Sequence, residues 1–342
     1  MATYKGIQGF TVQSLSSDPT ASSGTVGKLW YNSGTGKFRL GVEGGGAWAS
    51  GGDLSTARGI GGIAGTQTAA IVVGGYGSAS GPPPFSNTNV TQTYDGSSWT
   101  TSPATLGTTR RTLAACGTTT ATLAFGGDAR PPGLQAVTLT EDYDGSSWTE
   151  VNAMNTAKSK FGGAGTNTAG LAFGGEAADD SKIAATEKFD GTSWTEVNAL
   201  NTARHNAGSC GVQTSAMFCG GGGPSIQTTV ETFDGTSWTT GTAMTTARES
   251  GGASGASSTA AIAYAGYNGP PGYTTNTEVW DGSSWTEVGN LAVTKFQGYM
   301  QSSGTSAACL WVGGQLQPPA IYTAGTEEFN SPNYTTQTVT VS

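Results

Sequence analysis

One six-residue phrase, an aromatic residue followed by Asp, Gly, two hydroxyl residues and Trp, occurs five times in this chain. The copies read YDGSSW at 94–99 and 143–148, FDGTSW at 189–194 and 233–238, and WDGSSW at 280–285. Trp48 precedes them and Tyr334 follows in the degraded copy FNSPNY, so the aromatic landmarks lie 44 to 51 residues apart. Such a period is typical of proteins built from one repeated structural unit. The sequence therefore predicts six units.

Each unit carries strand and turn signals in the same order. An Asp-Gly pair between aromatic-bearing segments is a strong hairpin signal, because glycine accepts the positive φ of a tight turn. Apolar runs such as TLAFGG at 122–127 and small-residue runs such as FGGAG at 161–165 supply further strands. Glycine accounts for 55 of 342 residues and charged residues for 11%, which disfavours long helices. We predict an all-β chain, a β-propeller of six four-stranded blades, with seven blades as the alternative.

Each unit also contains a basic residue and an acid at equivalent positions. The acid lies two residues before the aromatic residue of the phrase, and Gln92 replaces it in the first unit. Buried charges need partners, so we expect repeated pairing inside the blades. The alternative is a ring of cations that binds anions at the channel mouth. The basic residues are Arg58, Arg110, Lys158, Arg204, Arg248 and Lys295, and the acids are Glu141, Glu187, Glu231, Glu278 and Glu327.

These landmarks resemble the kelch motif, which has a basic residue before its first strand and paired glycines ending its second. A Tyr or Phe followed by Asp lies on its third strand, and a Trp opens its fourth. The resemblance covers residues 51–334 and implies a kelch-type β-propeller in which Trp99, Trp148, Trp194, Trp238 and Trp285 are structural. It implies no particular activity, because kelch propellers include enzymes and many binding proteins.

Longer stretches of the sequence resemble one group of kelch proteins more closely. The phrases LSTARGIGGIAGTQTAA and ATEKFDGTSWTEVNALNTAR, behind the leader GKLWYNSGTGKFRLGVEGGGAWASGG, resemble kelch-type virion proteins of tailed phages, especially those of marine cyanobacteria. The leader itself resembles segments of phage tail-fibre and appendage proteins. This resemblance implies a place in a virus particle and multiple copies in an assembly.

We expect three segments along the chain. Residues 1–27 are predicted to form an irregular arm, 28–50 a leader hairpin ending in Trp48, and 51–342 the propeller. Two closures of the ring remain open. The tail TTQTVTVS at 335–342 can supply the outer strand of the sixth blade, which leaves the leader as a docking element. Alternatively, the leader joins the ring through AWAS at 47–50 or as a partial seventh blade.

The loops between the second and third strands differ in every unit, whereas the turns at the other end are nearly invariant. Loops on a rigid scaffold usually carry recognition, so we predict a binding face formed by these variable loops. The alternative is that their aromatic residues only pack on one another or on neighbouring subunits. The candidate binding residues are Tyr76, Phe85, Arg130, Tyr267, Tyr273 and Tyr322.

Several functional classes are disfavoured. The catalytic relative galactose oxidase builds its copper centre from two histidines and tyrosines, but this chain has only His205. The sialidase Asp box, S-x-D-x-G-x-T-W, is one residue longer than the present phrase. We therefore expect no enzyme, no cofactor and no metal site. A net charge of −8 with 15 scattered basic residues argues against nucleic-acid binding. No signal peptide and no membrane-spanning stretch are expected.

The sequence thus predicts a non-enzymatic structural protein of a tailed-phage virion, made in the host cytoplasm. A tail or fibre component in assembly or host attachment is the first expectation, with contact to another virion protein through the N-terminal arm. The alternatives are a capsid-decorating protein and a lectin-like propeller that binds a host surface glycan or receptor.

Overall fold

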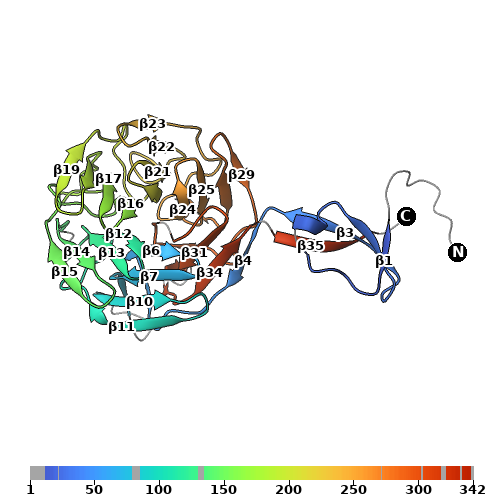
Figure 1. Cartoon of the computed structure of the whole chain (residues 1–342). Helices are drawn as coiled ribbons and strands as arrows, with labels where there is room; N and C mark the ends of the chain where they lie inside the picture. Colours follow the sequence, from blue (N-terminus) through green and yellow to red (C-terminus); the bar gives the residue numbers. More distant parts are fainter. Residues whose placement is uncertain are drawn as a thin grey trace. The chain divides into compact units, whose positions relative to one another are not determined.

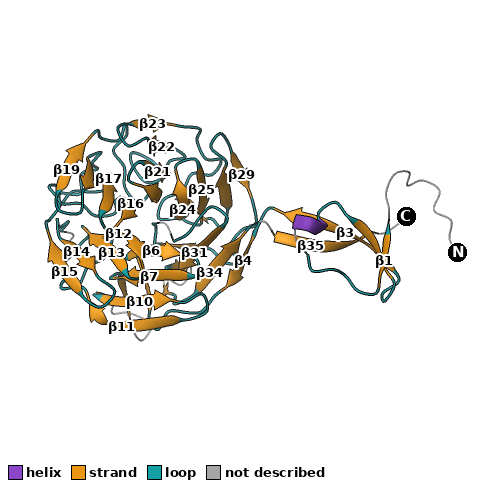
Figure 2. Ribbon diagram, viewed as in Figure 1, coloured by secondary structure: helices purple, strands orange, loops and turns teal. Residues whose placement is uncertain are grey.

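The computed structural model describes residues 12–21, 23–78, 85–129, 135–270, 272–301, 303–316, 321–331 and 333–339. The chain forms two compact units, which we call the propeller unit (residues 48–329) and the terminal unit (residues 1–47 and 330–342). Almost all regular structure is strand, and the described residues contain one short helical turn, η1 (Ser23–Thr25) (Figures 1 and 2). No helix in this described part is long and apolar enough to cross a membrane.

The propeller unit is a ring of antiparallel sheets, as the repeat predicts, and the fold is a kelch-type β-propeller (Figure 1). The first five blades each have four strands, ordered from the centre outwards. They are β6 (Gly62–Thr66), β7 (Ala69–Val73), β10 (Val90–Tyr94) and β11 (Trp99–Thr105); β12 (Ala114–Thr118), β13 (Ala121–Phe125), β14 (Thr140–Tyr143) and β15 (Trp148–Val151); β16 (Gly162–Thr166), β17 (Ala169–Phe173), β18 (Thr186–Phe189) and β19 (Trp194–Val197); β20 (Gly208–Val212), β21 (Ser215–Cys219), β22 (Val230–Phe233) and β23 (Trp238–Thr240); β24 (Gly252–Ser257), β25 (Ala260–Tyr264), β28 (Thr277–Trp280) and β29 (Trp285–Glu287).

The sixth blade joins the two ends of the propeller unit. Its strands are β31 (Ala308–Val312), β34 (Thr326–Asn330) and, outermost, β4 (Ala47–Ser50). An irregular segment takes the innermost position, where the Tyr299 amide donates to the Val312 carbonyl at 3.4 Å. The ring therefore closes through AWAS, one of the two closures that the sequence left open. Trp48 is the tryptophan of blade 6, and the expected role of Tyr334 as its degraded copy is wrong.

The terminal unit combines the leader with the tail. The predicted leader hairpin is β2 (Leu29–Asn32) paired antiparallel with β3 (Lys37–Gly44). The tail strand β35 (Asn333–Val339) pairs antiparallel with β3, and β1 (Gln13–Leu15) pairs parallel with β2. Residues 13–27 are therefore not wholly irregular, and the propeller ends before the tail rather than at residue 342. Residues 1–11 of the expected arm lie outside the described part.

The repeated phrase forms a hairpin turn at the outer edge of each of the first five blades. In the first copy, Gly96 has a φ of 92°, and the Asp95 carboxylate accepts bonds from the Ser97 and Ser98 amides at 2.9 and 2.8 Å. Tyr94 and Trp99 face each other across the strands with ring centroids 4.9 Å apart. The phrase is therefore a turn closed by a cross-strand aromatic pair.

The tryptophans also link neighbouring blades. The indole N–H of each donates to a threonine hydroxyl on the third strand of the preceding blade, at 2.9 to 3.1 Å, in five of six blades. The fourth blade has Val230 at this threonine position, and Trp285 donates instead to the Thr242 carbonyl at 3.1 Å. The pairs are Trp99–Thr326, Trp148–Thr91, Trp194–Thr140, Trp238–Thr186 and Trp48–Thr277.

Small residues let the innermost strands approach one another closely. A Cβ added at Gly62 would lie 2.8 Å from the Ala115 methyl of the next blade, and one at Gly163 would lie 2.6 Å from the Ala114 methyl. Because both contacts are shorter than ordinary packing distances, larger side chains would push the blades apart. The glycine-rich runs therefore set the width of the central channel, whose mouth on the side of the Asp-Gly turns forms a cavity of about 190 Å³.

Candidate functional site

We call the side of the propeller that carries the loops between second and third strands the variable face. Its loops are held by short ladders to the segments that enter the innermost strands. These ladders are β5 (Ala57–Gly59), β8 (Tyr76–Ser78) and β9 (Ser86–Asn87) in blade 1; β26 (Tyr267–Gly269) and β27 (Gly272–Tyr273) in blade 5; and β30 (Lys295–Phe296), β32 (Gln315–Leu316) and β33 (Ile321–Tyr322) in blade 6. Tyr76, Tyr267, Tyr273 and Tyr322 thus lie on paired strands, and Phe85 immediately precedes one.

Three of the candidate aromatic residues form one cluster between blades 6 and 1. The rings of Tyr76, Phe85 and Tyr322 meet edge to face, with centroids 5.1 to 5.9 Å apart. The Arg111 guanidinium lies 4.6 Å from the Tyr76 ring centre, within the range of a cation–π contact. Tyr322 is buried, which raises its pKa to about 12, and its hydroxyl donates to Gln297 at 3.2 Å. Tyr76 and Phe85 remain partly exposed.

A second cluster lies on blades 5 and 6. The Tyr273 ring is 5.2 Å from Tyr267 and 4.7 Å from Phe296, and all three are partly exposed. Five of the six candidate residues therefore belong to two aromatic clusters on the variable face, in which the rings pack on one another and all but Tyr322 remain partly exposed. Arg130, the sixth candidate, lies outside the described residues.

A cluster of charged side chains on blades 3, 4 and 5 escaped the sequence prediction. Glu176 pairs with Lys160 and with Lys182 at 2.6 Å, and His205 Nδ1 lies 3.3 Å from the same carboxylate. Glu249 lies 4.0 Å from His205 Nε2. Burial lowers the pKa of His205 to about 4, so at neutral pH it is uncharged. The available signal was a charged or titratable residue placed one or two positions after the repeat basic residue.

The six repeat basic residues are buried and engaged inside their own blades. Arg110 contacts Glu141 at 2.7 Å, and its guanidinium also donates to the Gly126 and Leu139 carbonyls. Carboxylates also partner Lys158, Arg204, Arg248 and Lys295. Arg58 instead donates to the Gln92 amide oxygen at 2.9 Å. These contacts match the expected pairing and leave little of the cationic ring free for an anion at the channel mouth.

Six backbone hydrogen bonds encircle the channel on the variable face. The amide of one residue in each blade donates to the carbonyl of its counterpart in the neighbouring blade, and the last bond joins Ile60 to Gln297 at 3.0 Å. All six residues are non-glycine and have φ between 51 and 56°, the left-handed region. The ring consists of Ile60, Thr112, Lys160, Asn206, Ser250 and Gln297.

The described residues offer little of the chemistry of a metal or thiol site. Among them, no group of three His, Cys, Asp or Glu side chains converges as metal ligands. Cys116, Cys210, Cys219 and Cys309 are free and buried, and burial raises the pKa of each thiol. Such thiols are poor nucleophiles because the reactive thiolate is disfavoured.

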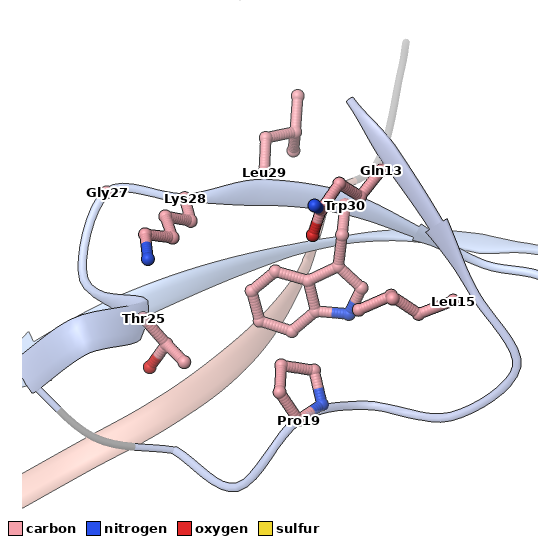
Figure 3. Close-up of a pocket in the computed structure, with 8 residues that line it drawn as sticks. All are labelled: Gln13, Leu15, Pro19, Thr25, Gly27, Lys28, Leu29 and Trp30. Atoms are coloured by element: carbon pink, nitrogen blue, oxygen red, sulfur yellow. The ribbon is translucent and has the colours of Figure 1, made fainter. Parts of the chain in front are cut away.

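The terminal unit has a cavity of its own, of about 720 Å³ (Figure 3). The Trp30 indole lies beside Leu15 and Pro19 at this cavity, with Thr25 and Lys28 on its other side (Figure 3). Asp18 fixes the indole by accepting from its Nε1 at 3.0 Å, and also pairs with Arg39 at 3.1 Å. The cavity is therefore mainly apolar with one cation near its edge.

Comparison with known proteins supports the fold. No family model and no curated protein sequence matches the chain. By contrast, 220 solved protein chains match its structure. One of them is YjhT, with a TM-score of 0.65 and 14% sequence identity over 80% of this chain and 96% of that one. At this identity the likeness is one of fold, a kelch-like β-propeller.

Proposed function

We propose that this chain is a non-enzymatic structural component of a tailed-phage virion, part of the tail or a fibre. In this proposal the variable face contacts a binding partner, and the terminal unit attaches the protein to another virion protein. The phrase resemblance to phage kelch proteins supplies the setting. The main structural support is the contrast within the propeller, because the repeated charged residues are engaged inside the blades while the aromatic clusters reach the surface.

The terminal unit supports the attachment role. Its sheet is built by both the leader and the tail, and its apolar cavity lies beside β1 and β2. Apolar concave surfaces of this size are common at sites of recognition. The cavity and the resemblance of the leader to tail-fibre segments favour attachment through this unit.

The proposal is tested by locating the protein in the particle and by altering the variable face. A cryo-EM map of the virion should contain a six-bladed ring at the tail; a ring on the capsid surface would instead establish the decorating role, and no ring would refute both. Phage carrying either Phe85→Ala or Tyr273→Ala should assemble normally and adsorb about tenfold more slowly, because each substitution removes a partly exposed ring from the variable face.

A matched control is Thr120→Ala, which changes an exposed residue in a turn at the opposite side of the propeller. We expect this variant to assemble and adsorb like the parent phage. If the Phe85→Ala and Tyr273→Ala phages adsorb as fast as the control and the parent phage, the aromatic clusters have no role in host attachment. The cryo-EM map reports only where the protein lies in the particle. It therefore tests the place of the protein in the virion separately from the role of the variable face.

The aromatic clusters also favour a second candidate, a lectin-like role in host attachment. Partly exposed tyrosine and phenylalanine rings are suitable platforms for the apolar faces of sugars. A glycan array probed with the full chain should then give hits that weaken in the Phe85→Ala or Tyr273→Ala protein. An array without hits would eliminate this candidate and leave a protein receptor or a virion protein as the partner.

A further inference from the structure

Blade 1 departs from the charge pattern of the other blades at one buried position. The basic residue of blades 2 to 6 contacts a carboxylate, as in Arg110–Glu141 at 2.7 Å and Arg248–Glu278 at 2.6 Å. In blade 1 the acid is replaced by Gln92, whose neutral amide accepts from Arg58 Nη2 at 2.9 Å. The other five blades thus act as an internal reference for what this position normally holds.

The substitution leaves a buried positive charge. The Arg58 side chain is 1% exposed, and among the described residues no carboxylate pairs with it. Its Nη1 donates to the Val90 carbonyl at 3.2 Å, and its Nε has no partner among the described atoms, as is also true of Arg110, Arg204 and Arg248. A buried cation is costly unless an opposite charge compensates it, so the blade lacks one negative charge.

A cavity lies beside this arginine. It has a volume of about 220 Å³ and is lined by Arg58 together with residues of β8, β9 and the start of β10. The hydroxyl-bearing residues Thr56, Ser86 and Thr88 also line it. Thr88 Oγ1 accepts from the Val90 amide at 3.2 Å, which leaves its own proton free to donate. The space holds several times the volume of a water molecule, enough for a small anion.

We propose that blade 1 binds a small oxyanion, a carboxylate or a phosphate, in this cavity beside Arg58. The anion supplies the negative charge that glutamate supplies in the other blades, and the threonine and serine hydroxyls donate to its oxygens. Arginine suits this role because its planar guanidinium matches carboxylate and phosphate oxygens. The proposal goes beyond the virion role and does not depend on it.

The test uses the full chain and a variant that builds the missing charge into the protein. Sodium acetate or sodium phosphate is titrated at constant ionic strength, and the melting temperature Tm is followed. We expect a saturable rise of Tm with at least one of the two anions, as binding to the folded state requires. Without added anion, the Gln92→Glu protein should have a higher Tm than the parent protein. Its apparent affinity for the anion should be at least about tenfold weaker than that of the parent protein.

The matched control is Thr100→Glu, which adds the same charge to an exposed position on β11 of the same blade. It should keep the saturable response. No saturable response in the parent protein, or the same response in Gln92→Glu, would overturn the proposal. Should Gln92→Glu fail to fold, crystals of the parent protein soaked in selenate decide: anomalous density beside Arg58 supports the site, and its absence there refutes it.

Discussion

At the scale of single residues, the aspartates of the repeated phrase are the most informative titratable groups. The Asp95 carboxylate accepts bonds from two backbone amides and two serine hydroxyls, and these bonds lower its pKa from 3.8 to about 2. The pKa values of Asp144 and Asp281 are lowered by the same kind of bonds. All three side chains are exposed, so hydrogen bonding rather than burial determines the direction.

These shifts predict acid sensitivity. The folded carboxylates stay ionised to lower pH than in the unfolded chain, so their stabilising effect is present above the unfolded pKa of 3.8 and disappears as the pH falls towards 2. We expect the free energy of unfolding in urea to be lower at pH 3 than at pH 5. The triple variant Asp95→Asn, Asp144→Asn and Asp281→Asn should show a smaller difference between the two pH values.

The control for this experiment is Asp180→Asn, which changes an exposed aspartate outside the repeated turns. Its pH dependence should equal that of the parent protein. If the triple variant also keeps the full difference between pH 5 and pH 3, the turn carboxylates are not its source.

At the scale of elements, the entry into each innermost strand could not be predicted from the sequence. The six residues with positive φ share no residue type, since they include the β-branched Ile60 and Thr112 as well as Lys160. A left-handed backbone costs an L-residue about 1–2 kcal/mol, which local preference would avoid. The conformation exists because each amide there reaches a carbonyl of the neighbouring blade. Five of these bonds join residues 44 to 52 positions apart, and the bond from Ile60 to Gln297 joins residues 237 positions apart.

Ser250 offers a test of this ring. Ser250→Gly should raise the free energy of unfolding by about 0.5–1 kcal/mol, because glycine relieves the strain of φ 56° and returns only part of the gain as unfolded-chain entropy. Ser250→Pro should lower it by about 3 kcal/mol or more, because proline forbids this φ and removes the amide that donates to Asn206 at 2.7 Å. Urea unfolding measures both.

The conservative variant Ser250→Ala serves as the control, since it keeps both the amide and the strained φ. Its stability should lie close to that of the parent protein. A glycine variant less stable than the alanine variant would show that the positive φ is not a source of strain at this position.

At the scale of the whole molecule, the sequence predicted the architecture but not its closure. The blades were predictable because Trp99 and its equivalents, the paired glycines and the Asp-Gly turns recur at one period. The closure of the ring was not predictable, because AWAS and TTQTVTVS are both short, strand-like segments. Which of them completes blade 6 depends on non-local pairing, of AWAS with β34 and of the tail with β3. At the candidate site, the differences between the loops located the aromatic residues. The Glu176 cluster was missed because its members come from three different blades, and the charged residues that follow the repeat basic residues do not show which groups meet.

The division of the chain predicts how fragments behave. A protein trimmed to residues 46–331 keeps β4 and every other described strand of the propeller unit and loses only the terminal unit. It should be monodisperse by gel filtration and unfold cooperatively. A protein of residues 52–342 keeps the tail but lacks β4, so blade 6 has an unpaired edge at β34. We expect it to aggregate or to melt at a much lower temperature.

Point variants in the full chain test the closure through β4 without removing any segment of the protein. Trp48 contacts the Tyr264 and Phe329 rings at 4.9 and 5.3 Å and donates to Thr277, so Trp48→Ala should lower the stability of the propeller by about 3 kcal/mol. Trp30→Ala, the matched change in the terminal unit, should leave the propeller's melting transition in place. If the 52–342 protein melts like the 46–331 protein, and Trp48→Ala has no effect, the ring does not close through β4.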